Sequence, residues 1–418
     1  MKQVIAMISL GCPRNLVDTE TLAGRLNFKN YQIVDDLALA QVVIVNTCAF
    51  IKEAKLESID LILDLIALKK QGKLKKIIVY GCLAQRYKNL AKELPEVDAF
   101  VGTLDLGPQT KRFPLTPQHY AYLKICEGCV NYCSYCIIPK LKGSLKSLAV
   151  ATIISKVKEL NREKVSELNI IGQDITSFGI DLVGKSQLVS LLPKIISAAP
   201  DIGWIRLLYL NPQRVTLELL ELIASSNQIC KYIDLPIQHI NNRILKLMNR
   251  PLAKEEIVAL IAKIRKVIPG VCLRTSLIVG FPSETEKEFN ELLEFVQIAK
   301  FDRLGAFIYS REEGTPAYKF NGQIPQKIKQ QRFDKIMSVQ QKVAAEINAK
   351  FFGRCIKVLV EEKYDAGYIG RSQYDAPEVD GVVYISTQQK LTIGKFVQVK
   401  ITDTLEYDLV GELNYESG

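Results

Sequence analysis

The sequence predicts an α/β fold in three parts: an N-terminal parallel α/β domain, a partial (β/α)6 barrel and a small C-terminal antiparallel β-barrel. Three observations support this. Short Val- and Ile-rich runs alternate with helical patterns near the N-terminus, six more such repeats follow, and the final part alternates apolar and polar residues. Strand–helix repeats are typical of parallel sheets, whereas strict alternation is typical of antiparallel ones. We expect domains at 1–105, 119–350 and 351–418, with a linker at 106–118.

The composition is that of an ordinary globular protein. Of the 418 residues, 48% are hydrophobic and 24% are charged, which suits two or three domains with buried cores. We expect a cytoplasmic protein, because no segment has the length and hydropathy of a membrane span or of a secretory leader. The chain has ten cysteines. In a reducing cytosol, clustered cysteines bind metal more often than they form disulfides.

In the N-terminal domain, one cysteine directly follows each expected strand. The strands are expected at Gln3–Ser9, Val42–Asn46 and Ile77–Tyr80, and the helices at Asn15–Asn27, Ile51–Lys70 and Ala84–Leu94. The three cysteines are Cys12, Cys48 and Cys82. Any one of them alone would be interpreted as a core residue. The carboxyl ends of parallel strands share one edge of the sheet, so three thiols there predict a metal cluster. A zinc site would need a remote fourth ligand, since the chain has only two histidines.

The central part repeats the strand–helix pattern six times after a break rich in Pro and Gly. The six strands are expected at Tyr120–Cys126, Glu167–Gly172, Trp204–Leu210, Tyr232–Leu235, Val271–Val279 and Arg303–Tyr309. The helices are expected at Ala151–Arg162, Leu188–Ala198, Leu217–Ala224, Arg243–Met248, Lys254–Ile268 and Glu284–Ala299. Parallel barrels place their chemistry at the carboxyl ends of the strands.

A second cysteine set follows the first strand of this barrel. Cys129, Cys133 and Cys136 form a C-x3-C-x2-C pattern, which lets one loop supply three thiolates to an iron–sulfur cluster. Cys126 lies three residues earlier. A ferredoxin-like cluster with four protein ligands, or half of a zinc ribbon, therefore remains an alternative at this point.

Other polar residues stand at strand ends of the same barrel. Gln173 and Asp174 end the second strand and His239 follows the fourth, so all three are candidate catalytic residues. His239 alone would more often be structural. Gly280 ends the fifth strand and would let the backbone approach a ligand, although a turn glycine is the alternative. Ser283 and Glu286 have the spacing of a capping box. A further segment, 312–316, is expected either to line the cavity or to form an exposed turn.

The C-terminal part differs in charge from the rest of the chain. A long amphipathic helix is expected at Gln326–Lys350, and a barrel of short strands at Phe351–Gly418. The whole chain carries a formal charge of +10. From Arg354 onward it has seven Lys and Arg against eleven Asp and Glu, which gives −4 for this part and +14 for the remainder. Such an acidic module is poorly suited to binding phosphates, and no direct DNA binding is expected.

These motifs resemble a known family over essentially the whole chain. The segment 120–136, with its three cysteines, resembles the signature of radical S-adenosylmethionine (SAM) enzymes. A three-cysteine domain before it and a TRAM-type barrel after it are similar to the methylthiotransferase family. Within that family, Ser9–Glu20 and Gly370–Gly381 resemble the RimO-type branch, which modifies ribosomal protein S-twelve. The tRNA-modifying MiaB type is the near relative and the alternative.

The resemblance implies two 4Fe-4S clusters and SAM as cofactors. Cys129, Cys133 and Cys136 match the ligands of the cluster that binds SAM and cleaves it to a 5′-deoxyadenosyl radical. Cys12, Cys48 and Cys82 match the ligands of an auxiliary cluster that carries the sulfur to be inserted. One SAM would methylate that sulfur, and a second would supply the radical that activates the β-carbon of an aspartyl residue. A low-potential electron donor such as flavodoxin would be required.

The charge distribution and three departures from the family pattern bear on this expectation. An acidic terminal barrel would favour a basic ribosomal protein over tRNA, so we expect residues 351–418 to dock the substrate. Cys126 stands where the family usually has Ser, and Lys142 and Leu148 stand where it usually has Arg. Lysine does not reproduce the guanidinium fork. An iron–sulfur electron carrier with Cys126 as fourth ligand is the non-enzymatic alternative, but it leaves the six-unit barrel and the N-terminal set of Cys12, Cys48 and Cys82 unexplained.

Overall fold

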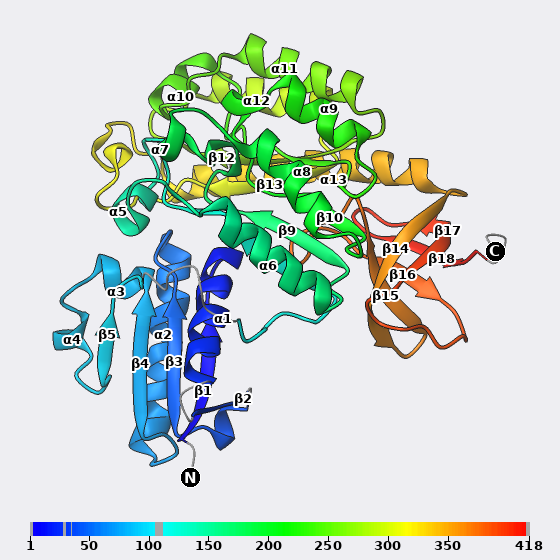
Figure 1. Ribbon diagram of the computed structural model, residues 1–418. Coiled ribbons are helices and arrows are strands. Elements are labelled where there is room, and N and C mark those ends of the chain that lie inside the picture. Colours follow the sequence, from blue (N-terminus) through cyan, green and yellow to red (C-terminus); the bar gives the residue numbers. More distant parts are fainter. Residues whose placement is uncertain (1–2, 28–30, 35, 105–111, 415–418) are drawn as a thin grey trace. The chain divides into compact units, whose positions relative to one another are not determined.

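The computed structural model describes residues 3–27, 31–34, 36–104 and 112–414 (Figure 1). The chain divides into two compact units, which are described separately. The first contains Met1–Pro117, Cys126–Thr152 and Ser310–Tyr318, and the second contains the rest. The expected linker at 106–118 falls partly outside the described residues. Among those that are described, no helix combines the length and apolarity that crossing a membrane requires.

The first unit is built on a five-stranded parallel sheet with the order β2-β1-β3-β4-β5. Its strands are β1 Gln3–Ser9, β2 Tyr31–Val34, β3 Val42–Thr47, β4 Lys76–Gly81 and β5 Ala99–Val101. The three expected strands are confirmed as the centre of the sheet. All six residues of β3 are buried, and the first four form a continuous apolar run of the kind typical of a parallel sheet. The edge strands β2 and β5 were not expected, because they are short.

Helices α1 Pro13–Asn27 and α2 Lys52–Lys70 match the expectation, but the third helix does not. A single helix at Ala84–Leu94 was wrong: the chain forms α3 Cys82–Arg86 and α4 Leu90–Glu93. Tyr87 leaves the helical conformation, with φ −119° and ψ 85°. Its ring lies against the cations of Lys55 and Arg86, at 5.8 and 5.3 Å from the ring centroid. The break in the helix thus coincides with two cation–π contacts at Tyr87.

The second unit contains the six strands of the predicted partial barrel. They are β6 Tyr120–Lys124, β9 Glu167–Ile171, β10 Trp204–Leu207, β11 Tyr232–Asp234, β12 Cys272–Val279 and β13 Arg303–Ile308. They form two parallel groups, β6-β9-β10 and β11-β12-β13. The Leu210 N–H donates to the Asp234 carbonyl at 3.0 Å, which links the groups into one arc. The predicted (β/α)6 architecture is confirmed.

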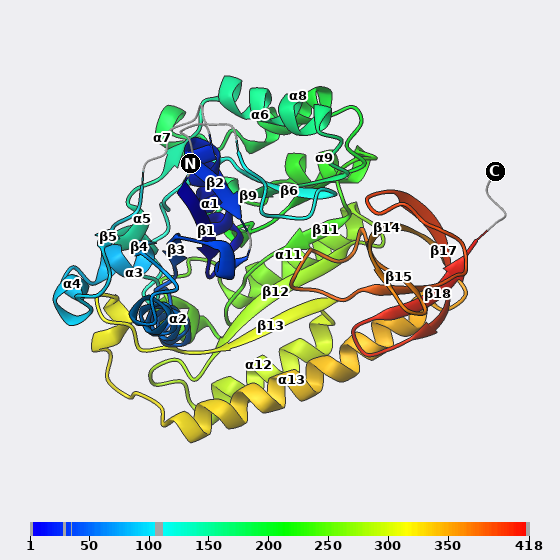
Figure 2. The ribbon, with the colours of Figure 1, turned by 90° about the horizontal axis from the view of Figure 1, so that it is seen from below.

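Seven helices accompany these strands. They are α6 Val150–Arg162, α7 Ile180–Val183, α8 Leu188–Ala198, α9 Leu217–Ser225, α10 Asn242–Leu247, α11 Lys254–Val267 and α12 Glu286–Ala299. The capping box of α12 uses Thr285 and Glu288 rather than the expected Ser283 and Glu286. Ser283 has φ +62° and precedes the helix. The long α13, Gln326–Asn348, packs along α12 and β13 (Figure 2).

The C-terminal part closes into a small barrel with the order β14-β15-β16-β18-β17. Its strands are β14 Cys355–Tyr364, β15 Gly367–Ser372, β16 Val383–Ser386, β17 Phe396–Thr404 and β18 Leu409–Leu413. One pair, β16 with β18, is parallel, so the barrel is not antiparallel throughout. The core residues Val358, Val360, Val383, Ile385 and Val399 are fully buried. Alternating apolar residues thus fill the interior.

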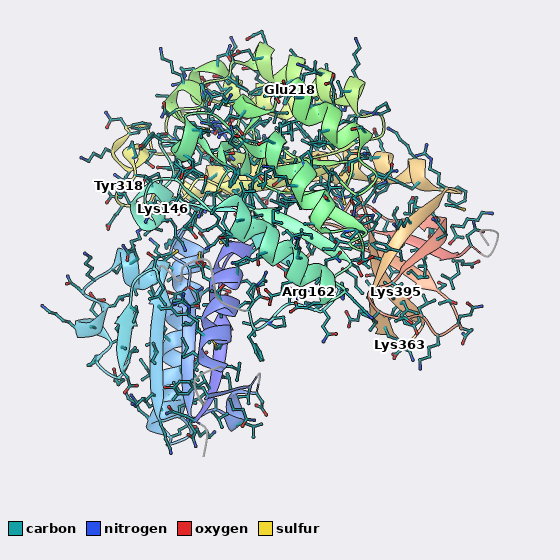
Figure 3. The ribbon with its side chains drawn as sticks, in the orientation of Figure 1. Lys146, Arg162, Glu218, Tyr318, Lys363 and Lys395 are labelled. Carbon is teal, nitrogen blue, oxygen red and sulfur yellow. The ribbon has the colours of Figure 1, made fainter. Side chains whose placement is uncertain are left out.

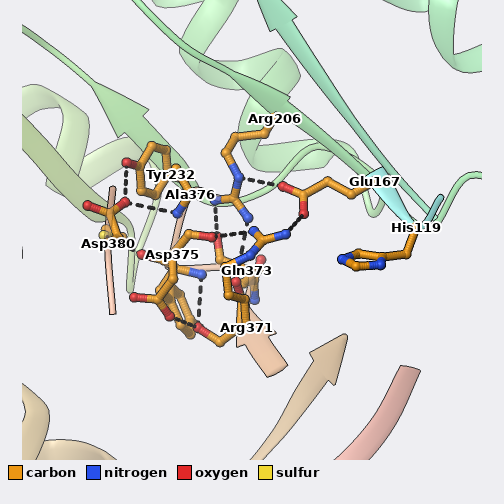
Figure 4. A network of polar contacts seen from close by, with 12 residues as sticks. His119, Glu167, Arg206, Tyr232, Arg371, Gln373, Asp375, Ala376 and Asp380 are labelled. Carbon is orange, nitrogen blue, oxygen red and sulfur yellow. Dashed lines mark hydrogen bonds and ion pairs between the residues drawn. The ribbon is translucent and has the colours of Figure 1, made fainter. Parts of the chain in front are cut away.

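The small barrel is joined to the (β/α)6 barrel by a buried ionic network (Figure 4). Glu167, the first residue of β9, accepts from Arg206 Nε at 2.7 Å and from Arg371 Nη2 at 2.6 Å. Arg371 also pairs with Glu361, whose Oε1 lies 3.0 Å from His119 Nε2. Glu167 and Arg206 are both 0% exposed. These charges are therefore satisfied internally, as buried ions must be.

The segment Gly370–Gly381 makes further contacts of this kind. Asp375 pairs with Arg303 at 2.6 Å, and Asp380 accepts from the Tyr232 hydroxyl at 2.6 Å. Glu378 accepts from the Tyr120 hydroxyl at 2.8 Å. Tyr120, Tyr232 and Arg303 are each the first residue of a barrel strand. The segment therefore covers the amino end of the barrel, opposite to the end that carries chemistry.

This network changes the interpretation of the acidic C-terminal charge. Four of the eleven acidic residues, Glu361, Asp375, Glu378 and Asp380, are used in the internal contacts just described. Basic residues such as Lys363 and Lys395 are exposed on the small barrel (Figure 3). The net charge of −4 therefore overstates the negative charge of its surface, and the argument for substrate docking through that charge loses its basis.

Candidate functional site

The three N-terminal thiols are positioned by the carboxyl edge of the first unit's sheet. Cys12 follows β1 and immediately precedes α1, Cys48 follows β3, and Cys82 opens α3. Gly11 has φ +87°, and a Cβ added there would lie 2.7 Å from Cys48 Cβ. Only glycine fits this approach. The structure therefore brings the turn that bears Cys12 against Cys48, and convergence of all three thiols on one cluster stays a prediction.

The local charges act differently on these thiols. Burial raises the pKa of Cys48, and it raises that of Cys82 to about 12. Burial opposes ionisation of Cys12 as well, but the Arg14 guanidinium, the Asn15 N–H and the charge of Lys142 together outweigh burial and lower the pKa of Cys12 below the ordinary value. Lys142 is the largest attractive charge for Cys82 and acts weakly on Cys12. Two cations thus favour thiolate at this edge.

Lys142 ties the second cysteine loop to α1 of the N-terminal domain. Its Nζ lies 3.0 Å from Asp18 Oδ2 and 3.8 Å from Glu127 Oε1, with 8% of its side chain exposed. Burial would lower the pKa of Lys142, but the two carboxylates raise it above the ordinary value. The lysine that replaces the family's usual arginine therefore keeps a charge at this place, although without the bidentate fork.

The second thiol set lies on a loop between short elements. Strand β7, Cys126–Glu127, pairs with β8, Lys146–Ser147, and α5 spans Ile138–Lys142. The Asn131 N–H donates to Cys129 Sγ at 3.3 Å, and the Ile138 N–H donates to the sulfur of Cys136. Burial, followed by the neighbouring Cys133 and Cys129, raises the pKa of Cys136 to about 12.

Cys126 occupies a different setting from the other three cysteines of this region. It lies in β7 opposite Ser147 and is 1% exposed, whereas Cys129, Cys133 and Cys136 are partly exposed. A strand position in the core is what the three-ligand interpretation requires of Cys126. Its role as a bystander stays a prediction.

Both thiol sets fit iron–sulfur ligation. In the part of the chain that the structure describes, no three Cys, His, Asp or Glu side chains converge closely enough to hold a single metal ion. A cluster is bound through separate iron atoms, so its cysteines need not converge on one point. Amide N–H groups donate to Cys12, Cys48, Cys129 and Cys136, and such bonds stabilise thiolate sulfur.

Gln173 and Asp174 follow β9 in the second unit, as expected. Asp174 is 3% exposed, caps the turn at Ile175–Ser177 through the Thr176 N–H, and pairs with Arg214 at 2.8 Å. Gln173 is partly buried. Asp174 therefore fixes the chain beyond β9 to the chain beyond β10, and a catalytic role for either residue stays a prediction.

His239 lies beyond β11 and is completely buried. Its Nδ1 accepts from the Asn241 N–H at 3.0 Å, whereas within the described residues its Nε2 has no hydrogen-bond partner. Burial lowers the pKa of His239 to about 3, so the ring is neutral at physiological pH. Its catalytic role likewise stays a prediction.

Gly280 follows β12 with φ +72°. A Cβ at this position would lie 2.4 Å from Lys329 Cγ of α13. Lys329 is 6% exposed, and its Nζ donates to the Tyr309 carbonyl at 2.8 Å. Glycine is therefore needed here to admit the lysine of α13, and SAM binding by Gly280 stays a prediction.

Two features of the first unit were not identified from the sequence. Arg14 lies within the Ser9–Glu20 motif, but nothing in the sequence indicated that its charge acts on Cys12. Glu312 was expected to lie in the cavity or in an exposed turn, but it is 2% exposed and forms two ion pairs. No local pattern reveals a buried carboxylate whose partners are more than 200 residues away.

Comparison with known protein families gives three matches in chain order. Residues 4–102 match the uncharacterized protein family UPF0004, residues 123–296 match the radical SAM superfamily, and residues 352–413 match the TRAM domain. These are the three architectural parts expected from the sequence.

Full-length relatives share nearly half of the residues. The chain is 47% identical to "Ribosomal protein uS12 methylthiotransferase RimO" of Clostridioides difficile (strain 630) and 46% identical to the protein of that name from Clostridium novyi (strain NT); each match covers 99% of both chains. Among solved structures, the radical S-adenosylmethionine methyltransferase TsrM from Kitasatospora setae has a TM-score of 0.55 at 13% identity, covering 85% of this chain and 79% of TsrM. That likeness shows a shared fold.

Proposed function

The chain belongs to the family of ribosomal protein uS12 methylthiotransferases named RimO, and from this premise we propose its reaction. The enzyme attaches a methylthio group to the β-carbon of an aspartyl residue in ribosomal protein S-twelve, with SAM as co-substrate. One structural observation carries the proposal: both three-thiol sets occur in the same compact unit. The relatives described above are named for uS12, which does not support the tRNA-modifying alternative.

Six cysteines would hold the cofactors. Cys129, Cys133 and Cys136 would bind the 4Fe-4S cluster that receives SAM, and Cys12, Cys48 and Cys82 would bind an auxiliary 4Fe-4S cluster. When bound, these groups supply the electron-transfer, radical and sulfur chemistry. The chain's own residues shape the surroundings. Amide donors and the cations of Arg14 and Lys142 stabilise thiolates, and burial of the thiol edge limits access of water.

The remaining assignments are part of the same proposal. Gln173, Asp174 and His239 are candidate catalytic residues, and Gly280 is a candidate SAM contact. A low-potential donor such as flavodoxin would supply electrons. The substrate implies a cytoplasmic enzyme, because ribosomes assemble there. The division into domains at 1–105, 119–350 and 351–418, joined at 106–118, is proposed on the sequence pattern.

The direct test is anaerobic reconstitution with iron and sulfide, followed by incubation of ribosomal protein S-twelve with SAM and a reductant. Mass spectrometry should find one methylthio group in place of one hydrogen, located on an aspartyl residue. A triple Cys12, Cys48 and Cys82 to Ala variant should lose this product, whereas Cys230→Ala, a change of a 2% exposed core cysteine, should retain it. Modified tRNA beside unmodified S-twelve would overturn the proposal.

A further inference from the structure

The segment Ser310–Tyr318 belongs to the first unit, although β13 of the second unit leads directly into it. We call it the strap. Three of its residues, Glu312, Thr315 and Ala317, are 2%, 4% and 0% exposed. An exposed turn would not bury a carboxylate, since a buried charge is costly unless it is paired. The strap is therefore a packed element of the thiol-bearing unit.

The strap binds the N-terminal domain through Glu312. Its Oε2 lies 2.9 Å from Lys55 Nζ on α2 and 2.8 Å from Arg86 Nη1 on α3. Arg86 also donates to the Ala49 carbonyl at 2.8 Å. Ala49 directly follows Cys48, and α3 begins at Cys82. The carboxylate thus rests on the two segments that carry the second and third thiols of the sheet edge.

Other strap residues contact the second cysteine loop. The Ala317 N–H donates to the Ser134 carbonyl at 2.8 Å, and Ser134 lies between Cys133 and Cys136. Gly314 has φ +87°, and a Cβ there would lie 3.0 Å from Ile137 Cδ1. One short segment therefore contacts the chain segments that carry both thiol sets.

The charges at Glu312 favour this contact. Burial raises the pKa of Glu312, but hydrogen bonds from Ser310, Lys55 and Arg86 outweigh burial and hold its pKa below the ordinary value. The Ser310 hydroxyl donates to Glu312 Oε1 at 2.6 Å, so both carboxylate oxygens are engaged. A neutral side chain would leave Lys55 and Arg86 without their shared counter-charge.

We propose that Glu312 is a positioning residue, which through its ion pairs with Lys55 and Arg86 holds the strap so that the Cys12, Cys48 and Cys82 edge keeps a fixed distance from the Cys129–Cys136 loop. The proposal rests on the proposed function, in which both thiol sets act on one substrate. Transfer to that substrate depends on this spacing. Binding of iron at either thiol set, and cleavage of SAM at the Cys129, Cys133 and Cys136 site, do not depend on it.

The first test uses metal-free protein and therefore does not depend on activity. Glu312→Gln keeps the size of the side chain and removes its charge. Glu313→Gln is the matched control, because Glu313 is its exposed neighbour in the same strap. Hydrogen–deuterium exchange should become at least tenfold faster in the strap, at 49–58 and at 129–140 in Glu312→Gln, and should stay unchanged in β14–β18. Unchanged exchange in both thiol-bearing regions would overturn the proposal.

The second test uses reconstituted enzyme. In Glu312→Gln, iron and sulfide per chain should match the parent, while methylthiolated product per 5′-deoxyadenosine should fall at least tenfold. Gly314→Ala places a methyl group against Ile137 and leaves the ion pairs of Glu312 intact, and it should lower the same ratio. This second variant tests the positioning role of the strap if Glu312→Gln fails to fold. An unchanged ratio, or a parallel loss of iron, would contradict a positioning role. If the parent forms no product, the proposed function fails. The hydrogen–deuterium exchange result still tests whether Glu312 positions the two thiol-bearing segments.

Discussion

The three thiols of the N-terminal set differ in how readily they ionise. Arg14 lowers the pKa of Cys12, whereas burial raises that of Cys48 and raises that of Cys82 to about 12. The thiolate is the nucleophile in alkylation. In metal-free protein at pH 7.5, iodoacetamide should therefore label Cys12 at least tenfold faster than Cys48 or Cys82. Peptide mass spectrometry over time measures the labelling rate of each cysteine, and Arg14→Gln should slow the labelling of Cys12 selectively. Equal rates at all three would contradict this account.

His239 makes stability depend on pH in a defined window. Its folded pKa, about 3, lies below the ordinary value of 6.5, so its contribution is fully present above pH 6.5 and is lost as pH falls. From pH 7.5 to 5.5 this residue alone should reduce the unfolding free energy by about 1.4 kcal/mol.

Denaturant unfolding of metal-free protein and of His239→Gln at both pH values measures this effect. The variant should show a smaller loss of stability between the two pH values, by about the amount attributed to the histidine. An identical loss in both proteins would mean that the ring is not held neutral in the folded chain.

At the scale of elements, the segment Gly370–Gly381 fastens the small barrel to the amino ends of the barrel strands. Glu167 is completely buried and pairs with both Arg206 and Arg371. Burial raises the pKa of Glu167, but the two arginines outweigh it and hold the pKa below the ordinary value. Its stabilising effect is therefore present above about pH 4.5 and is lost as pH falls below it.

Removal of this one carboxylate leaves two guanidinium groups without their shared partner. Glu167→Gln should cost about 3–5 kcal/mol of stability, as expected when one member of a buried ion pair is lost. Glu362→Gln, an exposed change on β14, should alter stability by no more than about 0.5 kcal/mol. Thermal and denaturant unfolding compare the two, and equal effects would show that the network carries no net stability.

Periodicity predicted the elements well, but it could not predict their partners. The runs at Val42–Asn46 and Ile77–Tyr80 were located to within one residue at each end, because buried parallel strands are continuous apolar stretches. The helix predicted at Ala84–Leu94 failed at Tyr87, where the chain leaves the helical conformation and the ring contacts Lys55, which is distant in sequence, and the neighbouring Arg86. The motif at Gly370–Gly381 identified the branch of the family but gave no indication that its charges are internal.

At the scale of the whole molecule, the distribution of charge is decided by burial rather than by composition. The acidic total of the C-terminal part suggested a docking surface, yet four of its carboxylates face residues of the (β/α)6 barrel or Arg371. The positions of the cysteines beyond their strands, in contrast, were predictable, because spacing and strand position are local signals, whereas their role as cluster ligands stays a prediction. The burial of Glu312 was not predictable, since it depends on ion pairs with Lys55 and Arg86, which are far from it in sequence.

Deletion of residues 351–418 should therefore damage the barrel itself rather than remove a detachable docking module. Without this part, Arg303 loses Asp375 and Arg206 loses the Gln373 carbonyl, which leaves buried cations poorly compensated. The shortened chain should elute as aggregate in size-exclusion chromatography and lose cooperative thermal unfolding. A stable monomer that binds S-twelve more weakly than the full chain would instead restore the docking interpretation.

The same network has a consequence for synthesis of the protein. Domains generally fold in order as the chain leaves the ribosome. Glu167, Arg206 and Arg303 are translated long before Arg371 and Asp375, their buried partners. The charged residues at the amino ends of the barrel strands thus lack these partners until nearly the whole chain has been made. A nascent chain that stops short of Gly381 therefore cannot complete this barrel.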